Sequence, residues 1–389
     1  MTVHPSALSE LTDRIRQART APTPEDRLLR VRGGGSKDFF GAGLRGQLLP
    51  TQGLHGIVSY EPTELVVTVQ AGTPLLELEA ALLEKNQCLP FEPPHFGPAA
   101  TATVGGMVAS GLSGPARASV GAAKDYVLGA RFVNGRGEHL TFGGQVMKNV
   151  AGYDVSRLLA GSWGTLGVIT EVSLKVLAFA PSEATLVCEA DQSLALALLH
   201  GWGSQPLPLN ASCWAHDPAD GDKLFVRLRG AVAAVQAALP RMRADVLAQG
   251  GSAEVMDKAQ AGTHWVATRN QQLPFFNEPP TSDLCLWRLS VAQTAPVLDL
   301  PYAQLVEWHG GQRWLWAPAS AAAQLHALAY SAGGHATLFR RPAGALADAD
   351  AGAPVFAAQD ATQSRIQSAL QQQFDPDGVF NTRRLHSAA

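Results

Sequence analysis

Three consecutive glycines followed by a serine and a lysine are the first residues whose types and spacing could do chemistry. They come directly after a short apolar run at 28–31. Backbone N–H groups without neighbouring β-carbons can converge on one anion, and the serine hydroxyl adds a further donor. The segment therefore predicts a phosphate-binding loop, and a plain glycine turn is the alternative. Its residues are Gly33, Gly34, Gly35, Ser36 and Lys37.

A second segment, at 101–111, is made almost entirely of small residues, with the sequence TATVGGMVASG. Threonine hydroxyls and bare glycine backbone can line a flat ring with polar edges, because no bulky side chain holds the ring away. Close packing of a helix against its neighbour is the alternative. The candidate contacts in this segment are Thr101, Thr103, Gly105, Gly106 and Ser110.

A third glycine-rich segment lies at 161–170 and reads GSWGTLGVIT. The better-known cofactor and hydrolase motifs are not found here: the chain has no Walker A, HExxH or GxSxG sequence, and Gly161, Gly164 and Gly167 are spaced GxxGxxG rather than GxGxxG. Neither a P-loop nor a Rossmann dinucleotide fold is therefore indicated. Cysteines stand only at 88, 188, 213 and 285, too far apart for a disulfide framework, a zinc ribbon or an iron–sulfur ligand run.

Length and charge set the broad class. A chain of 389 residues predicts two or three domains. The formal net charge of −3 does not suit a protein that neutralises phosphates, so we expect no nucleic-acid partner. No run of eighteen apolar residues and no secretory signal are present, so we expect a cytoplasmic protein without a membrane anchor.

The elements expected to position these segments change in character near residue 178. Before it, strands are predicted at 57–60, 65–70, 126–133, 138–142 and 168–176, with a helix that begins at Thr73-Pro74. After it, helix and strand patterns alternate, which predicts a second α+β domain with an antiparallel sheet. Residues 344–358 are expected to be a linker, and a last helix is expected at 361–373.

Taken in order, the three segments resemble the FAD-binding domain of the vanillyl-alcohol oxidase / p-cresol methylhydroxylase (PCMH) superfamily, over about residues 28–178. The resemblance implies that the loop at 33–36 holds the FAD pyrophosphate and that Thr101–Gly106 lines the flavin. It also implies that Gly164–Thr170 closes the same site, which adds Val168 and Ile169 to the cofactor contacts. The FDPDGVFN segment at 374–381 resembles the family's closing segment. There Asn381 would be either a flavin contact or a turn residue.

Further motifs narrow the resemblance. KNVAGYD at 148–154 is similar to glycolate-oxidase-like and D-lactate-dehydrogenase-like members. The chain length, the run at 92–106 and GGHATLFR at 333–340 resemble the smaller FAD-binding subunits of bacterial glycolate oxidases. This resemblance implies a small 2-hydroxy-acid substrate, a paralogous FAD subunit and an iron–sulfur subunit as partners. Through that complex the chain could lie peripheral to the inner membrane.

The sequence departs from the family pattern at two points, one that concerns flavin attachment and one that concerns metal binding. Members that bond their flavin covalently often carry histidine just after the loop glycines, and Ser36 stands here, so we expect non-covalent FAD. The HxGDGNxH-like metal motif of related dehydrogenases is missing, so we expect no metal. The second domain offers histidines and arginines, but no spacing ties any two together, and the catalytic residues are left unassigned. These residues are His264, His309, His335, Arg288, Arg313, Arg340 and Arg341.

The expected fold class is α+β: a two-subdomain PCMH-type FAD-binding domain with a smaller cap domain. We expect the FAD domain over 1–178, completed by 361–389, and the cap over 179–360. The expected function is that of a flavin subunit that accepts hydride from glycolate or relays electrons to an iron–sulfur subunit. A stand-alone FAD oxidoreductase, a non-catalytic flavin-binding scaffold and an empty binding module are the alternatives.

Overall fold

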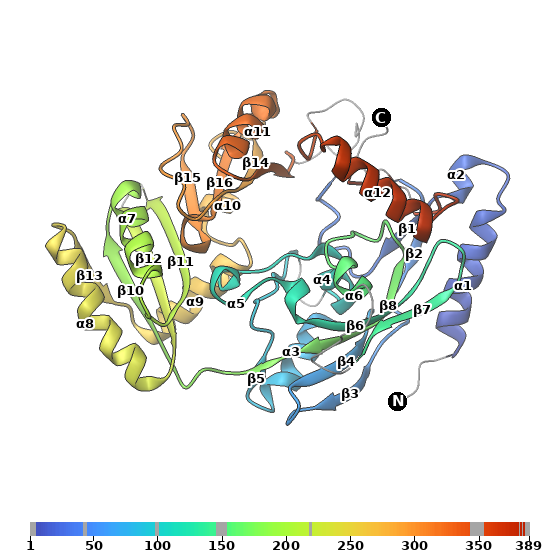
Figure 1. The fold of residues 1–389 in the computed structure, drawn as a ribbon, viewed down its shortest axis with the longest axis horizontal. Helices are drawn as coiled ribbons and strands as arrows, with labels where there is room; N and C mark the ends of the chain where they lie inside the picture. Colours follow the sequence, from blue (N-terminus) through green and yellow to red (C-terminus); the bar gives the residue numbers. More distant parts are fainter. Residues whose placement is uncertain are drawn as a thin grey trace.

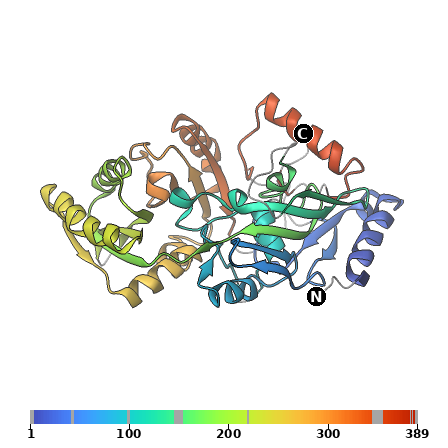
Figure 2. The same ribbon diagram turned by 60° about the horizontal axis from the view of Figure 1, so that its bottom comes forward.

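The computed structural model describes residues 5–41, 45–97, 101–144, 154–217, 220–342, 354–380, 382 and 384–385. Figure 1 shows two lobes side by side, with α8 at one end of the long axis and α1 at the other. Figure 2 keeps the same two elements at opposite ends after the turn. We call residues up to Ala178, together with the C-terminal segment from Ala361, the FAD lobe, and the part between them the cap lobe.

The FAD lobe is built on a five-stranded antiparallel sheet with the order β3-β4-β8-β6-β7. Its strands are β3 (Ile57–Glu61), β4 (Val66–Gln70), β8 (Val168–Lys175), β6 (Val127–Val133) and β7 (His139–Gly143). A parallel pair, β1 (Leu29–Arg32) with β2 (Gln47–Pro50), and a short pair, β5 (Gln87–Cys88) with β9 (Leu177–Ala178), complete it. Its helices are α1 (Pro5–Arg19), α2 (Pro24–Arg27), α3 (Leu75–Leu83), α4 (Val104–Ser110), α5 (Arg117–Val120), the 3₁₀ turn η1 (Ala123–Tyr126) and α6 (Val155–Leu158).

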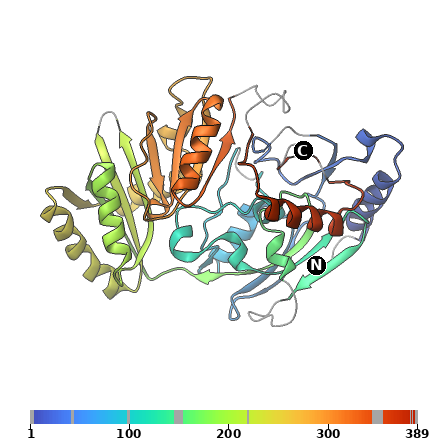
Figure 3. The ribbon, with the colours of Figure 1, turned by 45° about the horizontal axis from the view of Figure 1, so that its top comes forward.

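The cap lobe is built on one eight-stranded antiparallel sheet with the order β13-β10-β12-β11-β15-β16-β14-β17. These strands are β13 (Ser252–Val255), β10 (Ser182–Glu189), β12 (Gly221–Gly230), β11 (Leu209–Asp217), β15 (Gln304–Glu307), β16 (Gln312–Ala317), β14 (Cys285–Ser290) and β17 (His335–Arg340). The helices are α7 (Gln192–Gly203), α8 (Val232–Ala248), α9 (Lys258–Arg269), α10 (Pro274–Asn277) and α11 (Ala322–Ser331), with 3₁₀ turns η2 (Trp308–Gly310) and η3 (Ala319–Ala321). Figure 3 shows α7 and α11 lying against the same face of this sheet.

The other face of the cap sheet packs against the FAD lobe. Trp314, Trp316 and Phe339 from the cap share one hydrophobic cluster with Phe40 and Phe96 from the FAD lobe. Alternate residues of a strand point to opposite faces, so β16 sends Trp314 and Trp316 to this side and Leu315 to the core under α11. The two lobes therefore share a buried aromatic boundary.

The C-terminal segment returns to the FAD lobe. The last helix, α12 (Ala361–Phe374), lies over that lobe in Figures 1 and 3. Beyond it, the Val379 carbonyl accepts a hydrogen bond from the Leu29 N–H at 2.8 Å, and the Asp375 carboxylate accepts from two backbone N–H groups, of Val379 and Phe380. The end of the chain is thereby fixed beside β1, the strand that leads into the glycine loop.

Most elements predicted from the sequence are confirmed, including all five strands of the FAD lobe and the last helix, and β6 and β7 pair as a hairpin. The helix predicted to begin at Thr73-Pro74 begins at Leu75, and Thr73 does not cap it. Pro74 precedes the first residue of α3, and the Thr73 hydroxyl instead accepts from the Gly56 N–H. Part of the expected linker is bound to the sheet, because Phe356 bridges to Thr337; residues 343–353 lie outside the described residues. The domain boundaries at 178/179 and 360/361 stay a prediction.

Candidate functional site

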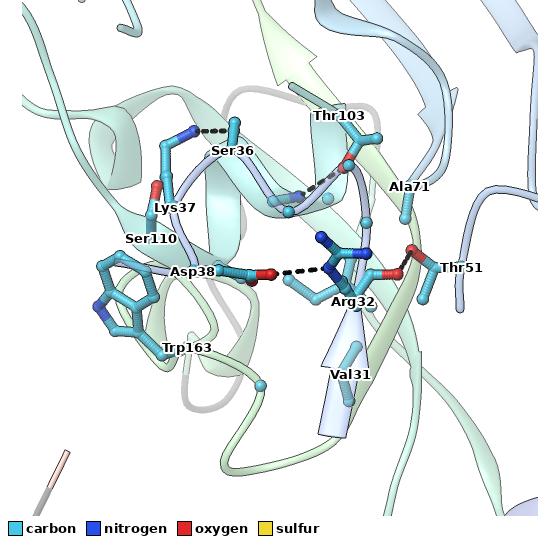
Figure 4. A pocket seen from close by; sticks show the side chains of 18 of the residues that line it. Val31, Arg32, Ser36, Lys37, Asp38, Thr51, Ala71, Thr103, Ser110 and Trp163 are labelled. Carbon is cyan, nitrogen blue, oxygen red and sulfur yellow. Dashed lines mark hydrogen bonds and ion pairs between the residues drawn. The ribbon is translucent and has the colours of Figure 1, made fainter. Parts of the chain in front are cut away.

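The pocket that brings the glycine-rich segments together lies in the FAD lobe (Figure 4). It is formed where the end of β1, the start of α4 and the start of β8 meet. The described residues that line it are Val31, Arg32, Gly33, Gly34, Gly35, Ser36, Lys37, Asp38, Thr51, Ala71, Thr103, Gly105, Gly106, Ala109, Ser110, Trp163, Gly164, Gly167, Ile169 and Arg384. Three segments that are far apart in the sequence thus face one space.

The glycine loop lies directly against the 101–103 segment. A β-carbon placed on Gly33 would lie 2.2 Å from the Thr103 hydroxyl oxygen, and one placed on Gly34 would lie 1.2 Å from the Thr101 carbonyl oxygen. Gly35 adopts a φ of +75°, in the left-handed region that favours glycine. Side chains are therefore excluded from the loop for three separate reasons, and its backbone stays bare.

The second segment forms the start of a helix. Thr103 precedes α4, and its hydroxyl accepts a hydrogen bond from the Gly106 N–H at 3.2 Å. Gly105 packs on Ala71 so closely that its N–H donates to the Ala71 carbonyl at 2.7 Å. A β-carbon on Gly105 would come within 2.6 Å of the Ala71 β-carbon. These contacts hold the first turn of α4 against the end of β4 and present its backbone to the pocket.

The third segment contributes alternate residues to the wall of the pocket. Gly167 and Ile169 line the pocket, while Val168 between them is fully buried in the core cluster of Leu29, Val133 and others. Neighbouring residues of an extended strand point to opposite faces, so Val168 and Ile169 cannot both face the same space. Trp163 also lines the pocket and stacks on Phe40, with ring centroids 4.3 Å apart.

The charges around the pocket are predominantly positive. Arg32 and Asp38 form an ion pair of 2.8 Å, and Asp38 is the only carboxylate among the described lining residues. Lys37 is buried, has its Nζ 3.4 Å from the Ser36 hydroxyl, and pairs with no carboxylate in the described parts of the chain. Burial lowers the pKa of Lys37 to about 8. A buried cation of this kind favours an anionic ligand.

Arg384 adds a second buried cation from the C-terminal segment. It donates to the Lys37 carbonyl at 2.7 Å and to the Phe40 carbonyl at 3.2 Å. Its guanidinium lies 4.8 Å from the centre of the Trp163 ring. Burial lowers the pKa of Arg384 to about 10. The C-terminal segment therefore closes one wall of the pocket and holds the 37–40 backbone in place.

Ten of the twelve cofactor contacts expected from the sequence line this pocket. They are Gly33, Gly34, Gly35, Ser36, Lys37, Thr103, Gly105, Gly106, Ser110 and Ile169. Thr101 lies beside the pocket, with its carbonyl against Gly34, and Val168 is in the core. The segment 148–153 and Asn381 lie outside the described residues. Sequence analysis missed Arg384, because only the folded chain brings its side chain to the loop. It did not single out Trp163 either, although this residue stands within the third segment.

The histidines and arginines of the cap lobe do not line this pocket. His264 stacks on Phe225, and burial lowers its pKa to about 4. His309 lies 3.0 Å from the Ser119 hydroxyl, and burial lowers its pKa to about 4 as well. His95, in the loop before the 101–111 segment, contacts the Glu79 carboxylate at 2.9 Å. In the described parts of the chain no three His, Cys, Asp or Glu side chains gather as metal ligands, and no helix there could cross a bilayer.

The pocket fits FAD by the chemistry of its donors. A loop that excludes β-carbons leaves N–H groups free to approach a pyrophosphate, Lys37 supplies an unpaired positive charge, and Trp163 offers an aromatic face. No histidine, cysteine or tyrosine occurs among the described lining residues. None of the described lining residues is therefore of a type that usually bonds covalently to a flavin.

Comparisons with known proteins agree with this geometry. Residues 1–143 match the family model described as an FAD binding domain. The chain is 43% identical over 377 residues to the glycolate oxidase subunit GlcE of Escherichia coli, which covers 97% of each protein. It is 32% identical over 155 residues to the glycolate oxidase subunit GlcD of Bacillus subtilis, covering 38% of this chain and 32% of that protein.

A solved structure extends the likeness of the fold to nearly the whole chain. An alkyldihydroxyacetonephosphate synthase matches 96% of this chain and 75% of its own, with a TM-score of 0.64 and 14% sequence identity. At that identity the match concerns the fold alone. Together with the family model, it confirms the predicted fold class, and the predicted FAD cofactor is confirmed by the family model and the relatives.

Proposed function

Because the chain belongs to the family of glycolate oxidase GlcE subunits, we propose that it is the FAD-binding subunit of a complex that oxidises glycolate or a similarly small 2-hydroxy acid. The observation that carries this proposal is the single pocket formed by the glycine loop, α4 and β8. Relatives that match 38% of this chain include a GlcD subunit and a D-lactate dehydrogenase, which are oxidoreductases acting on hydroxy acids.

Each group of lining residues has a role in holding the cofactor. The loop at 33–36 and the Lys37 ammonium would bind the pyrophosphate, because bare N–H groups and a buried cation both stabilise negative charge. Thr103, Gly105, Gly106, Ser110 and Ile169 would line the remainder of FAD, and Thr101 and Val168 would support them from behind. When bound, FAD supplies the acceptor for the hydride that leaves the α-carbon of a hydroxy acid. Arg384 and Trp163 would close the pocket against water.

The FAD is proposed to be non-covalent. The Ser36 hydroxyl is not among the side chains that usually attach to a flavin, and the described lining residues include no histidine, cysteine or tyrosine. Precipitating the protein with acid should therefore release all of the flavin into the supernatant, where its absorbance can be measured. Yellow colour that stays with the precipitated polypeptide would contradict this part of the proposal.

The partners we propose are a GlcD-like flavin subunit and an iron–sulfur subunit. The match to GlcD covers 38% of this chain, which fits two paralogous FAD-binding subunits in one complex. Cys88, Cys188, Cys213 and Cys285 are free thiols, and in the described parts of the chain no three His, Cys, Asp or Glu side chains gather as metal ligands. The cluster would therefore belong to a partner. Four unpaired cysteines also favour a cytoplasmic location.

Anaerobic reduction by glycolate tests the function. We would co-express the chain with the GlcD-like and iron–sulfur subunits, purify the complex, and record flavin absorbance after adding glycolate. We expect the flavin band to bleach in the complex and expect less bleaching in a complex that carries Gly34→Asp in this chain, in proportion to the lost flavin. A complex that assembles with full flavin content and does not respond to glycolate would overturn the proposal.

A further inference from the structure

A cavity separate from the FAD pocket is lined by residues of both lobes. Its volume is about 330 Å³, and among the described residues it shares no lining residue with the FAD pocket. Its walls come from α3, β5 and residues 89–92 of the FAD lobe and from β10, β12 and α9 of the cap. A cavity of about 150 Å³ can hold a benzene ring, so this one has room for a ligand of roughly twelve non-hydrogen atoms.

Three of the lining side chains are apolar and exposed to solvent. Leu83 is 63% exposed, Val266 is 53% exposed and Phe179 is 39% exposed, and we call these three residues the mouth of the cavity. Leu89 and Trp265 line the cavity as well and are buried. Exposed apolar side chains beside a cavity favour a ligand with an apolar body, because such a ligand removes their surface from water.

Arg227 brings a buried guanidinium to the wall of this cavity, and its side chain is held in place by three groups. Its Nε donates to the Asn210 side-chain oxygen at 2.7 Å, and its Nη2 donates to the Glu92 carboxylate at 2.7 Å. The guanidinium lies 4.8 Å from the centre of the Trp265 ring. None of its hydrogen bonds in the described parts of the chain uses Nη1, which carries two hydrogens. A ligand acceptor at Nη1 would complete the bonding of this buried cation.

Arg269, on α9, presents a second guanidinium to the same cavity in a similar way. Its Nε donates to the Pro93 carbonyl at 2.9 Å and its Nη2 to the Glu79 carboxylate at 2.7 Å. Neither of these bonds uses Nη1. The other oxygen of Glu79 lies 2.9 Å from Nε2 of His95, so both oxygens of this carboxylate have partners within the protein.

The other two carboxylates of the wall are also bound by the protein's own donors. Glu92 Oε1 accepts from Arg227 and from Arg229, and Glu92 Oε2 accepts from Arg227 and from the Ala116 N–H. Glu183 pairs with Arg229 at 2.6 Å. With two hydrogen bonds on each oxygen, Glu92 has no acceptor capacity left for a ligand. The hydrogen-bonding groups that the wall offers a ligand are therefore mainly donors.

We propose that this cavity binds an amphipathic carboxylic acid of about twelve non-hydrogen atoms, with its carboxylate on Nη1 of Arg227 and its apolar body within the mouth. Arg269 adds a second donor on the same cavity. An acid is favoured over an alcohol of the same size, because charge-assisted hydrogen bonds are roughly twice as strong as neutral ones. The bound acid would contact both lobes through residues that do not line the FAD pocket.

Binding of 4-phenylbutyrate to the purified full-length chain, loaded with FAD, tests the proposal. Calorimetry gives the affinity. The alcohol 4-phenylbutanol has nearly the same shape without the charge and should bind about tenfold more weakly. Acetate lacks the apolar body and should bind at least tenfold more weakly than 4-phenylbutyrate. Cys88 lines the cavity and is half-buried, whereas the other three cysteines are buried, so protection of its thiol from a maleimide reports occupancy of the cavity.

Substitutions at the wall locate the binding site. Val266→Asp places a negative charge at the mouth and should weaken binding of 4-phenylbutyrate about tenfold. Val232→Asp is the matched control, because Val232 is a similarly exposed valine on α8 that does not line the cavity, and it should leave the affinity unchanged. Arg227→Met should abolish the preference for the acid over the alcohol. Arg269→Met, at a partly exposed position, should reduce that preference and serves where Arg227→Met does not fold.

Several results would overturn the proposal. One is the absence of binding, and another is equal affinity for 4-phenylbutyrate and 4-phenylbutanol. Binding of the acid that is unchanged in both Val266→Asp and Arg269→Met would place the ligand elsewhere. Protection of Cys88 by co-purified partner subunits but not by the acid would also overturn it and would make the cavity part of a subunit interface. Flavin content and circular dichroism are measured on the same samples, and none of these results bears on the proposed function.

Discussion

Gly34 is the position where the loop and the 101–103 segment come closest. A β-carbon there would overlap the Thr101 carbonyl oxygen, and that backbone cannot move without shifting α4. Overpacking of this kind costs about 1–3 kcal/mol, so Gly34→Asp should weaken FAD retention about tenfold or more, before the repulsion of its carboxylate by phosphate is counted.

Flavin absorbance of the purified variant measures this effect. Gly201→Ala is the control, because a β-carbon on Gly201 meets nothing within 4 Å and the residue lies in α7, where alanine is favourable. Full flavin content in Gly34→Asp would contradict the assignment of the loop.

Because the pKa of Lys37 is lowered, we expect the affinity for FAD to depend on pH. Its pKa is lowered to about 8, so the ammonium is charged below that pH and lost above it in the empty pocket. The affinity for the FAD pyrophosphate should therefore be highest below pH 8 and should fall as pH rises towards 10. Bound phosphate favours the charged form, so the decrease begins at or above pH 8.

Lys37→Met should weaken FAD binding about tenfold to a hundredfold, the range for a lost charge-assisted hydrogen bond, and should flatten the pH profile. Titration of the deflavinated chain with FAD at several pH values measures both effects. Lys37→Arg keeps the charge and should keep measurable affinity at pH 9; equal profiles for the wild type and Lys37→Met would rule out the proposed role.

At the scale of elements, the features predicted most successfully from the sequence are those that depend on residues close together in the chain. The glycine loop and the 101–111 segment could be singled out because each depends on neighbouring residues. The β6–β7 hairpin is equally local, since the Asn134 side chain accepts from the Arg136 and Glu138 N–H groups. Arg384 could not be found in this way, because it meets Lys37 across 347 residues. Nor could a motif decide between Val168 and Ile169, since the strand period assigns them to opposite faces.

The contacts of Arg384, in the C-terminal segment, should slow the dissociation of FAD. Arg384→Met removes two hydrogen bonds to the 37–40 backbone and the contact with Trp163, while α12 stays in place. We expect FAD to dissociate about tenfold faster, from a loss of about 1–2 kcal/mol, with little change in far-ultraviolet circular dichroism. Stopped-flow transfer of FAD to an excess of an apo-flavoprotein measures the rate, with Arg365→Met as control. An unchanged rate would show that the segment does not close the pocket.

At the scale of the whole molecule, Glu92 joins the two lobes. Its carboxylate, on the FAD lobe, accepts from Arg227 at 2.7 Å and from Arg229 at 3.2 Å, both on β12 of the cap. Burial opposes ionisation of Glu92, but these two arginines outweigh it and hold its pKa below the ordinary 4.5. The ion pair therefore contributes stability above pH 4.5, and that contribution is lost as pH falls below this value.

Glu92→Gln should destabilise the chain by about 3 kcal/mol, because two arginines are left partly buried without their anion. Thermal unfolding measures this, and the difference from the wild type should vanish at acidic pH where Glu92 is protonated. Glu84→Gln, an exposed glutamate just after α3, should change the melting temperature little. A Glu92→Gln variant as stable as the wild type at pH 7 would show that the lobes do not depend on this bridge.

The flavin content of the purified full-length chain tests the central claim most directly. The claim is that one pocket, between the glycine loop, α4 and β8, holds one dissociable FAD. We predict a yellow protein, or a colourless one that takes up FAD to a ratio of about one per chain, that releases all of it in acid and whose Gly34→Asp variant stays largely empty. A chain that neither carries nor takes up FAD while its circular dichroism is that of a folded protein would contradict the account.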